Sequence, residues 1–340
     1  MLENYLWFIT TNWFTVIITI VVVMVLLNYS TWLLEWELSV LWKKLKIPGS
    51  VRWATFDAAS SSLPEFLTAL VWLMVLWDKW LEVWIGTIWG SAIFNILIIP
   101  AFVLLFYKWT KHIQLNLWGI RRDSVFYILS ILIFILWIFS WALTIMWVAL
   151  VLLYIVYLIV LYKHSIKHRK LNEKEIQADY DKVADKKVNY FLILLSLILI
   201  YVWVEASVVS AKWIWETLHI SMLVISLVLL AGITSIPDTL LSVKASKKWE
   251  ANAWIWNAVG SNIFDICIWL WFPILIWTLF MWLHPHVDFN SNIWVFVFLF
   301  ISVIIYFLIL SKKWLWKKDS LYLFVLYLLF IVYVFYLSIK

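Results

Sequence analysis

The stretches GSAIFNI at residues 90–96 and GSNIFDI at residues 260–266 decide the fold, because they agree at five of seven positions. A second shared element lies upstream of each: SSLPE at residues 61–65 and TSIPD at residues 234–238. The elements follow one another in the same order and at nearly the same spacing, so the turns between them absorb a small difference in length. The chain of 340 residues therefore contains two related halves.

The composition places both halves in a membrane. Hydrophobic residues make up 66% of the chain and charged residues 14%, against about 25% charged in soluble domains, which excludes a large soluble enzyme. Apolar windows of about 20 residues between charge clusters predict membrane-spanning helices. Ten such spans lie near residues 13–42, 53–77, 80–107, 124–140, 142–162, 189–211, 218–244, 250–279, 291–311 and 320–338. We therefore expect an all-α polytopic membrane protein.

Five spans fall in each half, and this odd number has a topological consequence. The second half must enter the membrane from the opposite side, so the repeat is an inverted one. We predict a first five-helix repeat at residues 1–163, a charged loop at residues 164–188 and a second five-helix repeat at residues 189–340. Glu35 and Glu205 match at the same offset as the two motif glycines, which extends the repeat to the first helix of each half.

Positive charge is distributed unevenly over the loops between the spans. Counted from the N-terminus, the odd-numbered loops hold 23 of the 26 Lys and Arg residues. The positive-inside rule therefore predicts a multi-pass protein of the cell membrane whose odd loops are cytoplasmic and whose termini both lie outside. The cytoplasmic loop 164–188 alternates in sign, which is typical of a solvated linker with room for one helix. The same loops account for the net charge of +6, so no nucleic-acid partner is expected.

Pro64 and Pro237 interrupt two of the predicted helices at matching positions. Proline lacks the backbone donor and clashes with the carbonyl four residues earlier, so it frees carbonyl oxygens inside the membrane. Hydroxyl residues stand four residues before a carboxylate or amide, and so share a helix face with it. The pairs are Ser61 and Glu65, Ser91 and Asn95, Thr234 and Asp238, and Ser261 and Asp265. Matched interruptions in inverted repeats indicate a transporter with a site near the bilayer midplane.

Two interpretations fit these polar residues. Ser, Thr and Asn side chains often join helices within a membrane bundle, and this is the simpler account of any single serine. It does not suit Glu65, Asp238 or Asp265, because a central carboxylate costs ~2.5–3.5 kcal/mol to insert and none has a nearby Lys or Arg in its span. A bound cation is the most economical partner, and oxygen ligands without Cys or His favour Ca²⁺ or Na⁺ over Zn²⁺ or copper. Asp57, two turns before Glu65, fits a vestibule residue and a bundle contact equally well.

The paired elements resemble the two α-repeats of the sodium/calcium exchangers, in the cation/calcium antiporter superfamily. The resemblance rests on AGITSIPDTLLSVKASKKWEANAWIWNAVGSNIFDI at 231–266, and on WATFDAASSSLPEFLTAL at 53–70 with WIGTIWGSAIFNI at 84–96. The sequence departs from the family pattern within these elements: Thr87 and Ala92 replace motif asparagines, and Ser60 and Ile233 replace leading glycines.

The resemblance implies ten helices in two inverted repeats, with Glu65 and Asp238 as central ion ligands. It further implies a surrounding ligand set, which consists of the side chains of Ser62, Ser91, Ser235, Ser261, Asn95 and Asp265 and the carbonyls of Ser61 and Thr234. Aspartate at position 265 occurs in potassium-dependent exchangers and in some potassium-independent ones, so this residue leaves a role for K⁺ open.

The function that follows is secondary active antiport of Ca²⁺ against Na⁺ by alternating access at a midplane site. Ca²⁺/H⁺ antiport by the same fold is the alternative, and an intramembrane aspartyl protease is a distant one. A protease needs two aspartates in flexible glycine-bearing motifs, whereas the matched pair here is Glu65 with Asp238, each flanked by hydroxyls. We therefore predict a transporter that is not an enzyme and needs no cofactor, with Ca²⁺ and Na⁺ as transported ions in a lipid bilayer. The sequence does not indicate an oligomeric state.

The chain has 29 Trp and only 6 Gly, although about 7% Gly is usual. Trp residues stand where the family pattern has glycine, as at Trp36, Trp53, Trp249, Trp256, Trp269 and Trp271. Some bacterial lineages read UGA as glycine, and translating such a gene with tryptophan at UGA produces this composition. Glycine lets helices approach closely, which an indole prevents. We predict that many of these positions are glycine in the living protein.

Overall fold

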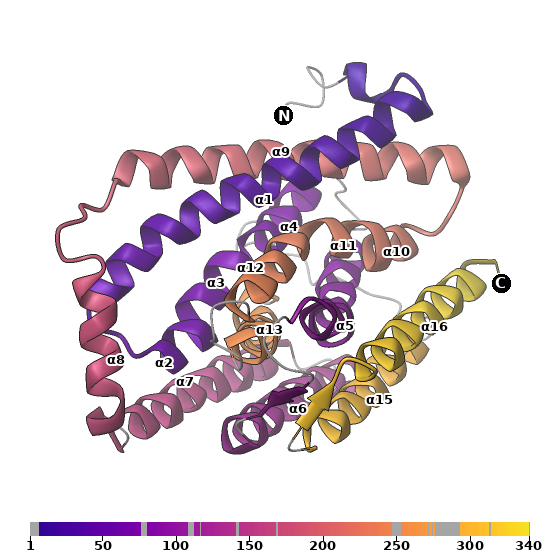
Figure 1. The fold of residues 1–340 in the computed structure, drawn as a ribbon. Helices are drawn as coiled ribbons and strands as arrows, with labels where there is room; N and C mark the ends of the chain where they lie inside the picture. The colour runs from indigo at the N-terminus through magenta and orange to yellow at the C-terminus, as the bar shows by residue number, and fades with distance from the viewer. Residues whose placement is uncertain are drawn as a thin grey trace.

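A computed structural model describes residues 7–75, 80–107, 112–115, 117–140, 143–167, 169–246, 253–270, 272–273, 275, 293–312 and 314–339. Over these residues the chain is almost entirely helical, with one short β-ribbon (Figure 1). Most of the helices coincide with the long apolar windows of the sequence. A helix suits a membrane because its backbone groups form hydrogen bonds within the same segment.

The first half begins with a 3₁₀ turn, η2 (Trp7–Thr10), and the 32-residue helix α1 (Trp13–Lys44). The second predicted span is broken into four pieces: α2 (Gly49–Arg52), the π-helical turn η3 (Trp53–Asp57), α3 (Ala58–Ser61) and α4 (Leu63–Val75). The half ends with α5 (Trp80–Phe106), α6 (Leu117–Ser140) and α7 (Leu143–Lys167). The charged loop that follows carries the helix α8 (Arg169–Asp181).

The second half repeats this order of long and broken helices. It begins with α9 (Tyr190–Leu218), followed by the pieces α10 (Met222–Ile225), η4 (Ser226–Leu230), α11 (Ala231–Thr234) and α12 (Ile236–Ser246), with η4 again π-helical. Next come α13 (Ala253–Phe264) with the π-helical turn η5 (Asp265–Trp269), then α15 (Ile293–Leu310) and α16 (Asp319–Ile339). The π-helical turns η3 and η4 occupy equivalent positions in the two repeats, and each precedes a proline element.

Each of the ten predicted spans is mainly helical over its described residues, but some boundaries differ and single residues interrupt some of the helices. Of the described helices, α1, α5, α7, α9 and α16 are each long and apolar enough to cross a membrane, and the α10–α12 segment, bent by 41°, makes a sixth span. The apolar helices α4 and α15 are shorter. Helix α9 continues to Leu218 rather than ending at residue 211, because Lys212 and Glu216 stay within the helix until His219 adopts a left-handed conformation and caps it. A charge therefore marks the end of the apolar window, not the end of the helix.

Two long tilted helices, α1 and α9, lie side by side across the broken helices (Figure 1). Helix α5 runs through the middle of the bundle and is mostly buried, touching α4, α12, α13, α15 and α16. Helix α5 is thus the scaffold to which both broken segments are attached.

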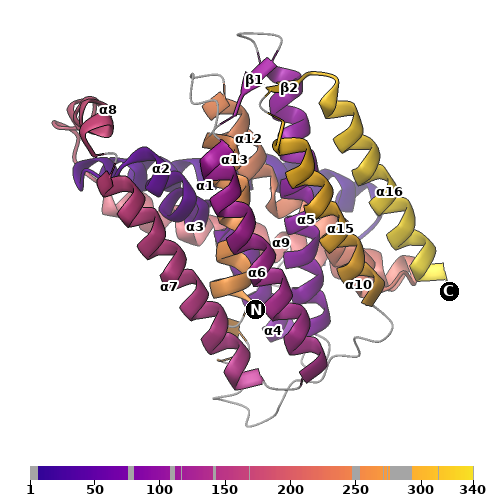
Figure 2. The same cartoon turned by 90° about the horizontal axis from the view of Figure 1, so that it is seen from below.

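Loops from the two halves meet at one end of the bundle. Strands β1 (His112–Gln114) and β2 (Trp314–Trp316) pair antiparallel, with Ile113 opposite Leu315. They belong to loops three and nine, which the charge count places on one side. Figure 2 shows this ribbon and α8 toward the same end of the molecule, opposite α4. We call this the basic end.

Two motif glycines explain how the halves approach each other. A Cβ on Gly90 of α5 would overlap the carbonyl oxygen of Leu227 in η4, and a Cβ on Gly260 of α13 would lie 2.8 Å from the carbonyl oxygen of Ala54 in η3. Each repeat therefore packs its glycine against the π-helical turn of the other repeat. Only glycine allows this contact, because any side chain would push the backbones apart.

Gly90→Ala is expected to destabilise the protein by about 1–3 kcal/mol, the usual cost of overpacking, because the new methyl group must displace backbone in η4. The measurement is the thermal transition of detergent-solubilised protein, followed by size-exclusion chromatography. Gly232→Ala is the control, since its Cβ would come no closer than 4.0 Å to the Phe94 ring. A Gly90→Ala transition equal to that of the parent protein would contradict this account of the crossed packing.

The tryptophans show an unusual lack of hydrogen bonds. Five described indole N–H groups are buried without a partner, those of Trp42, Trp72, Trp89, Trp254 and Trp269, although buried indoles usually find one. Trp84, which donates to the Leu270 carbonyl at 3.3 Å, shows the usual arrangement. Trp256 of the second repeat corresponds to Gly86 of the first. At Gly86 an added Cβ would overlap the Ser226 hydroxyl. Trp249 and Trp271 lie outside the described residues.

We therefore expect peptides from the native host that span residues 249–271 to contain glycine where the sequence has Trp256 and Trp269. Mass spectrometry of the purified protein reads these residues directly, with Gly260 as an internal reference. Finding tryptophan at both positions would overturn the codon-reassignment hypothesis.

Candidate functional site

The ten sequence-predicted site residues come from four helical segments and are brought together in the middle of the bundle. Each is buried, and none is more than 2% exposed. They are Ser61, Ser62 and Glu65 at the α3–α4 junction, Ser91 and Asn95 on α5, Thr234, Ser235 and Asp238 at the α11–α12 junction, and Ser261 and Asp265 on α13 and η5. The two junctions are equivalent under the repeat, as are α5 and α13.

Each broken helix is interrupted by one residue, Ser62 in the first half and Ser235 in the second. Pro64 and Pro237 then occupy the second position of α4 and α12, where a missing backbone donor costs little. The breaks correct one expectation: Ser61 and Thr234 do not continue the helix of the carboxylate that follows them. Their hydroxyls donate to carbonyls at the ends of the preceding π-helical turns, Ser61 to Asp57 at 3.0 Å and Thr234 to Leu230 at 3.1 Å.

Glu65 takes its hydrogen bonds from both halves of the chain. Its Oε1 accepts from the Ser91 hydroxyl at 3.2 Å and from the Ser235 hydroxyl at 3.4 Å. The two serine hydroxyls are themselves 2.9 Å apart. The proline element of the second half thus reaches the carboxylate of the first.

Asparagines of both halves contact the carboxylate of Asp238. Asn257 donates to its Oδ1 at 3.1 Å, and Asn95 lies at the hydrogen-bond limit of 3.5 Å from its Oδ2. Asn95 also donates to Asn262 at 3.0 Å, and Asn262 donates to the Tyr127 hydroxyl at 2.9 Å. The carboxylate of Asp238 is therefore anchored to α5 and α13 together.

The sequence prediction missed Asn257, Asn262 and Tyr127. Both asparagines stand in the quoted motif NAVGSN, where Thr87 and Ala92 are their counterparts in the first repeat, so the motif itself was a usable signal. Asn262 donates to the backbone carbonyl of Ala92, its own counterpart, at 3.1 Å. No sequence feature marks Tyr127, which lies on α6 outside both motifs.

Several oxygens in this cluster have no hydrogen-bond partner. They are Ser62 Oγ, Glu65 Oε2, Asn95 Oδ1, Asn257 Oδ1 and Asp265 Oδ1, all buried. A buried acceptor without a partner costs about 1–3 kcal/mol, more when charged, and native proteins rarely leave such groups in clusters. Carboxylate, amide and hydroxyl oxygens are the ligands that Ca²⁺ takes, usually six to eight at a time. The donor set therefore fits a hard cation.

The charges of the three carboxylates also favour a bound cation. The ion pairs among the described residues do not include Glu65, Asp238 or Asp265, so no basic side chain balances these carboxylates. In the same part of the chain, no three Asp, Glu, His or Cys side chains converge on one point. A cation here has to take most of its ligands from hydroxyls and amides, which does not suit Zn²⁺.

Comparison with known proteins identifies the family of the chain. The sequence profile of the family described as "Sodium/calcium exchanger protein" matches residues 15–163 and 188–336. Human sodium/potassium/calcium exchanger 5 is 34% identical over 136 residues, which is 38% of this chain and 27% of the human protein. Human sodium/potassium/calcium exchanger 1 is 31% identical over 156 residues, 46% of this chain but 14% of that protein. The match thus spans about a quarter or less of these relatives.

Solved structures share the fold over nearly the whole length. Native YfkE superposes with a TM-score of 0.72 at 15% identity, covering 98% of this chain and 96% of its own. The H⁺/Ca²⁺ exchanger CAX gives 0.66 at 13% identity over 95% and 86%, and the sodium–calcium exchanger NCX_Mj gives 0.59 at 22% identity over 93% and 97%. The prediction of an all-α membrane protein with two inverted five-helix repeats is confirmed. With the family profile matching both repeats, the chain belongs to the sodium/calcium exchanger family of membrane transporters.

Proposed function

We propose that this protein exchanges Ca²⁺ for Na⁺ across the membrane, and that the ions bind between Glu65 and Asp238. The observation that carries the proposal is the set of five buried oxygens without hydrogen-bond partners around these two carboxylates. Two carboxylates neutralise one Ca²⁺ where the protein excludes water, and the hydroxyl and amide oxygens replace its hydration shell. Two Na⁺ ions supply the same charge at the same oxygens.

Asp265 adds a third carboxylate to the same region. Its carboxyl group interacts electrostatically with Glu65 and Asp238, so a site loaded with one Ca²⁺ keeps one uncompensated negative charge whenever all three carboxyl groups are ionised. A monovalent cation bound beside Ca²⁺ balances this charge, and we propose that it is K⁺. The names of the relatives, sodium/potassium/calcium exchangers, include the same ion. Ca²⁺/H⁺ exchange, in which protons replace Ca²⁺ at these carboxylates, is the competing possibility for the fold.

The coupling ion is tested by Ca²⁺ flux into vesicles that contain purified protein. The rate is measured with an imposed Na⁺ gradient, then with a pH gradient, then with neither. Na⁺-driven flux that collapses without the Na⁺ gradient supports the proposal. Flux driven only by the pH gradient assigns Ca²⁺/H⁺ exchange instead, and flux that needs neither gradient contradicts both kinds of antiport.

We further propose that the basic end faces the cytoplasm and that both termini lie outside, because most of the Lys and Arg residues lie in the odd loops. The sole cysteine, Cys267, is buried, so labelling of an introduced cysteine has little background. Asp185→Cys, after α8, is expected to react with a membrane-impermeant maleimide only when the membrane is opened. Thr217→Cys, near the end of α9, is expected to react in intact cells. The opposite pattern would reverse the topology.

A further inference from the structure

A second polar feature lies outside the ion cluster, at the basic end. A cavity of about 140 Å³ opens between α1, the contiguous segments α2 and η3, and α12. Its polar lining residues include Glu35 and Ser39 on α1, Asp57 on η3 and Lys244 on α12. One water occupies about 30 Å³ in the liquid, so the cavity holds several waters or a partly hydrated cation.

Glu35 is the residue of this cavity that structural packing does not explain. Its side chain lies on the cavity wall, the residue is 9% exposed, and its Oε1 has no hydrogen-bond partner. A carboxylate in a membrane helix is costly unless it serves a ligand or an ion pathway. A structural carboxylate is found two residues away on the same helix, where Glu37 accepts a hydrogen bond from the Asn189 backbone at 2.8 Å.

The position of Glu35 links the cavity to the ion cluster. The charges that act on Glu35 are those of Asp57, Asp238 and Lys244. Asp57 lines the same cavity as Glu35, and Asp238 precedes the lining residue Leu241 by about one turn of α12. The cavity therefore adjoins the helix that carries Asp238 of the central cluster.

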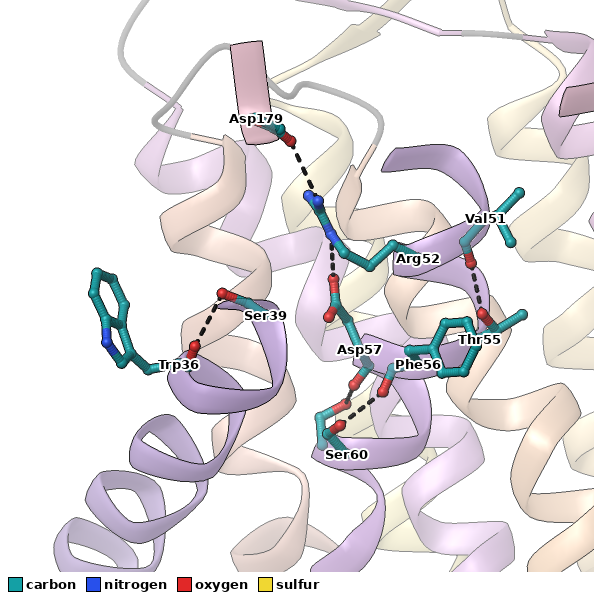
Figure 3. Close-up of polar contacts among 10 residues, drawn as sticks. Trp36, Ser39, Val51, Arg52, Thr55, Phe56, Asp57, Ser60 and Asp179 are labelled. Atoms are coloured by element: carbon teal, nitrogen blue, oxygen red, sulfur yellow. Dashed lines mark hydrogen bonds and ion pairs between the residues drawn. The ribbon is translucent and has the colours of Figure 1, made fainter. Parts of the chain in front are cut away.

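The outer carboxylate is already paired, as Figure 3 shows. Arg52 lies between Asp57 and Asp179 of α8, 3.2 Å from each. Asp57 thus both lines the vestibule and bonds within the bundle, the two roles that the sequence left equally open. This ion pair ties α8 to the lining of the cavity. Of the two lining carboxylates, Glu35 is the one without an ion pair among the described residues.

Lys244 is the basic group whose charge acts on Glu35. Its ammonium group lies 5.2 Å from the centre of the Trp32 ring, on the α12 side of the cavity. A lysine on a flexible stem can move aside when another cation arrives. Glycine in place of Trp36 and Trp53, which also line the cavity, would widen it and leave Glu35 and Lys244 in place.

We propose that Glu35 is a transient cation site on the route between the basic end and the Glu65–Asp238 cluster, and that the passing cation displaces Lys244 from it. The inference rests on the proposed function, because it concerns the path of the ion that the central cluster binds. By this account α12 carries two groups for transport. Asp238 binds the ion at the centre, and Lys244 competes with the ion for Glu35 at the entrance.

The test is Ca²⁺ transport in vesicles, with Ca²⁺ varied on one face of the membrane at a time. Glu35→Gln is expected to raise the half-saturating Ca²⁺ concentration several-fold at the face that carries the basic end, and to leave the opposite face unchanged. Lys244→Gln is expected to lower it at the same face. Glu37→Gln is the matched control on α1 and is expected to match the parent at both faces.

An unchanged Glu35→Gln, or a change of equal size at both faces, would overturn the inference. If Glu35→Gln does not insert, Lys244→Gln and Glu35→Asp are measured instead. The inference is overturned if Lys244→Gln leaves the half-saturating Ca²⁺ concentration unchanged. It is also overturned if Glu35→Asp raises that concentration equally at both faces. Ca²⁺ transport by the parent protein distinguishes failure of this inference from failure of the proposed function. A parent that moves no Ca²⁺ refutes the function, whereas an active parent with a Glu35 variant like itself refutes only the entry site.

Discussion

Glu65→Gln and Asp238→Asn are each expected to abolish Ca²⁺ flux while the protein still reaches the membrane. Each amide keeps one oxygen that can accept the shorter hydrogen bonds, from Ser91 and Ser235 in one case and from Asn257 in the other. Each change replaces the other carboxylate oxygen by an NH₂ group and removes the charge, without which Ca²⁺ cannot shed its water in a site of low dielectric constant. Each change also removes the cost of inserting a carboxylate, so the variants should accumulate at least as well as the parent.

The measurement is flux per inserted molecule, with the amount of protein in the vesicles determined separately. Glu37→Gln, which alters a buried carboxylate away from the cluster, is expected to retain the parent rate. Near-normal Ca²⁺ flux in both Glu65→Gln and Asp238→Asn would mean that these carboxylates are structural and that the ions bind elsewhere.

Asp265→Asn is expected to give a different result: Ca²⁺ flux persists, but its dependence on monovalent cations changes. The central pair still balances the charge of Ca²⁺, whereas the third negative charge is gone and no longer needs a partner. Its counterpart in the first repeat is already an amide, Asn95, so the variant makes the two repeats alike at this position. We expect stimulation by K⁺ to disappear.

Flux is measured as a function of K⁺ at constant Na⁺ and constant pH, and as a function of Na⁺ without K⁺. Two outcomes count against this assignment of Asp265. Complete loss of Ca²⁺ flux would place it among the central ligands, and an unchanged response to both ions would remove it from the site.

The sequence was sufficient to predict the helices and the equivalent positions, because both depend on local pattern. Long apolar windows located the spans, and Pro64 and Pro237 located the breaks in two of them. The ends of helices were less certain: Lys212 closes an apolar window, but α9 continues beyond it because a helix can extend into the polar surface of the membrane.

The partners across the site could not be predicted in the same way. The repeat shows that Glu65 corresponds to Asp238, but it does not show that Ser235 of the second half bonds to Glu65 of the first. That contact depends on how the helices cross. Gly260 and Gly90 pack against the π-helical turns η3 and η4 where the halves cross, and neither turn has a sequence signature. The same holds for Tyr127, which enters the network only because α6 lies beside α13.

The crossed contacts of Gly90 and Gly260 also bear on how such a chain could have originated. Neither half fills the groove beside its own glycine; the other half does so, through the turn at Leu227 or at Ala54. A single five-helix polypeptide inserted in both orientations would have met these contacts as an antiparallel homodimer. Duplication and fusion of its gene required only a bridge between the copies, in the stretch where α8 now lies, after which each half could diverge and, for example, carry asparagine at one position and aspartate at its twin.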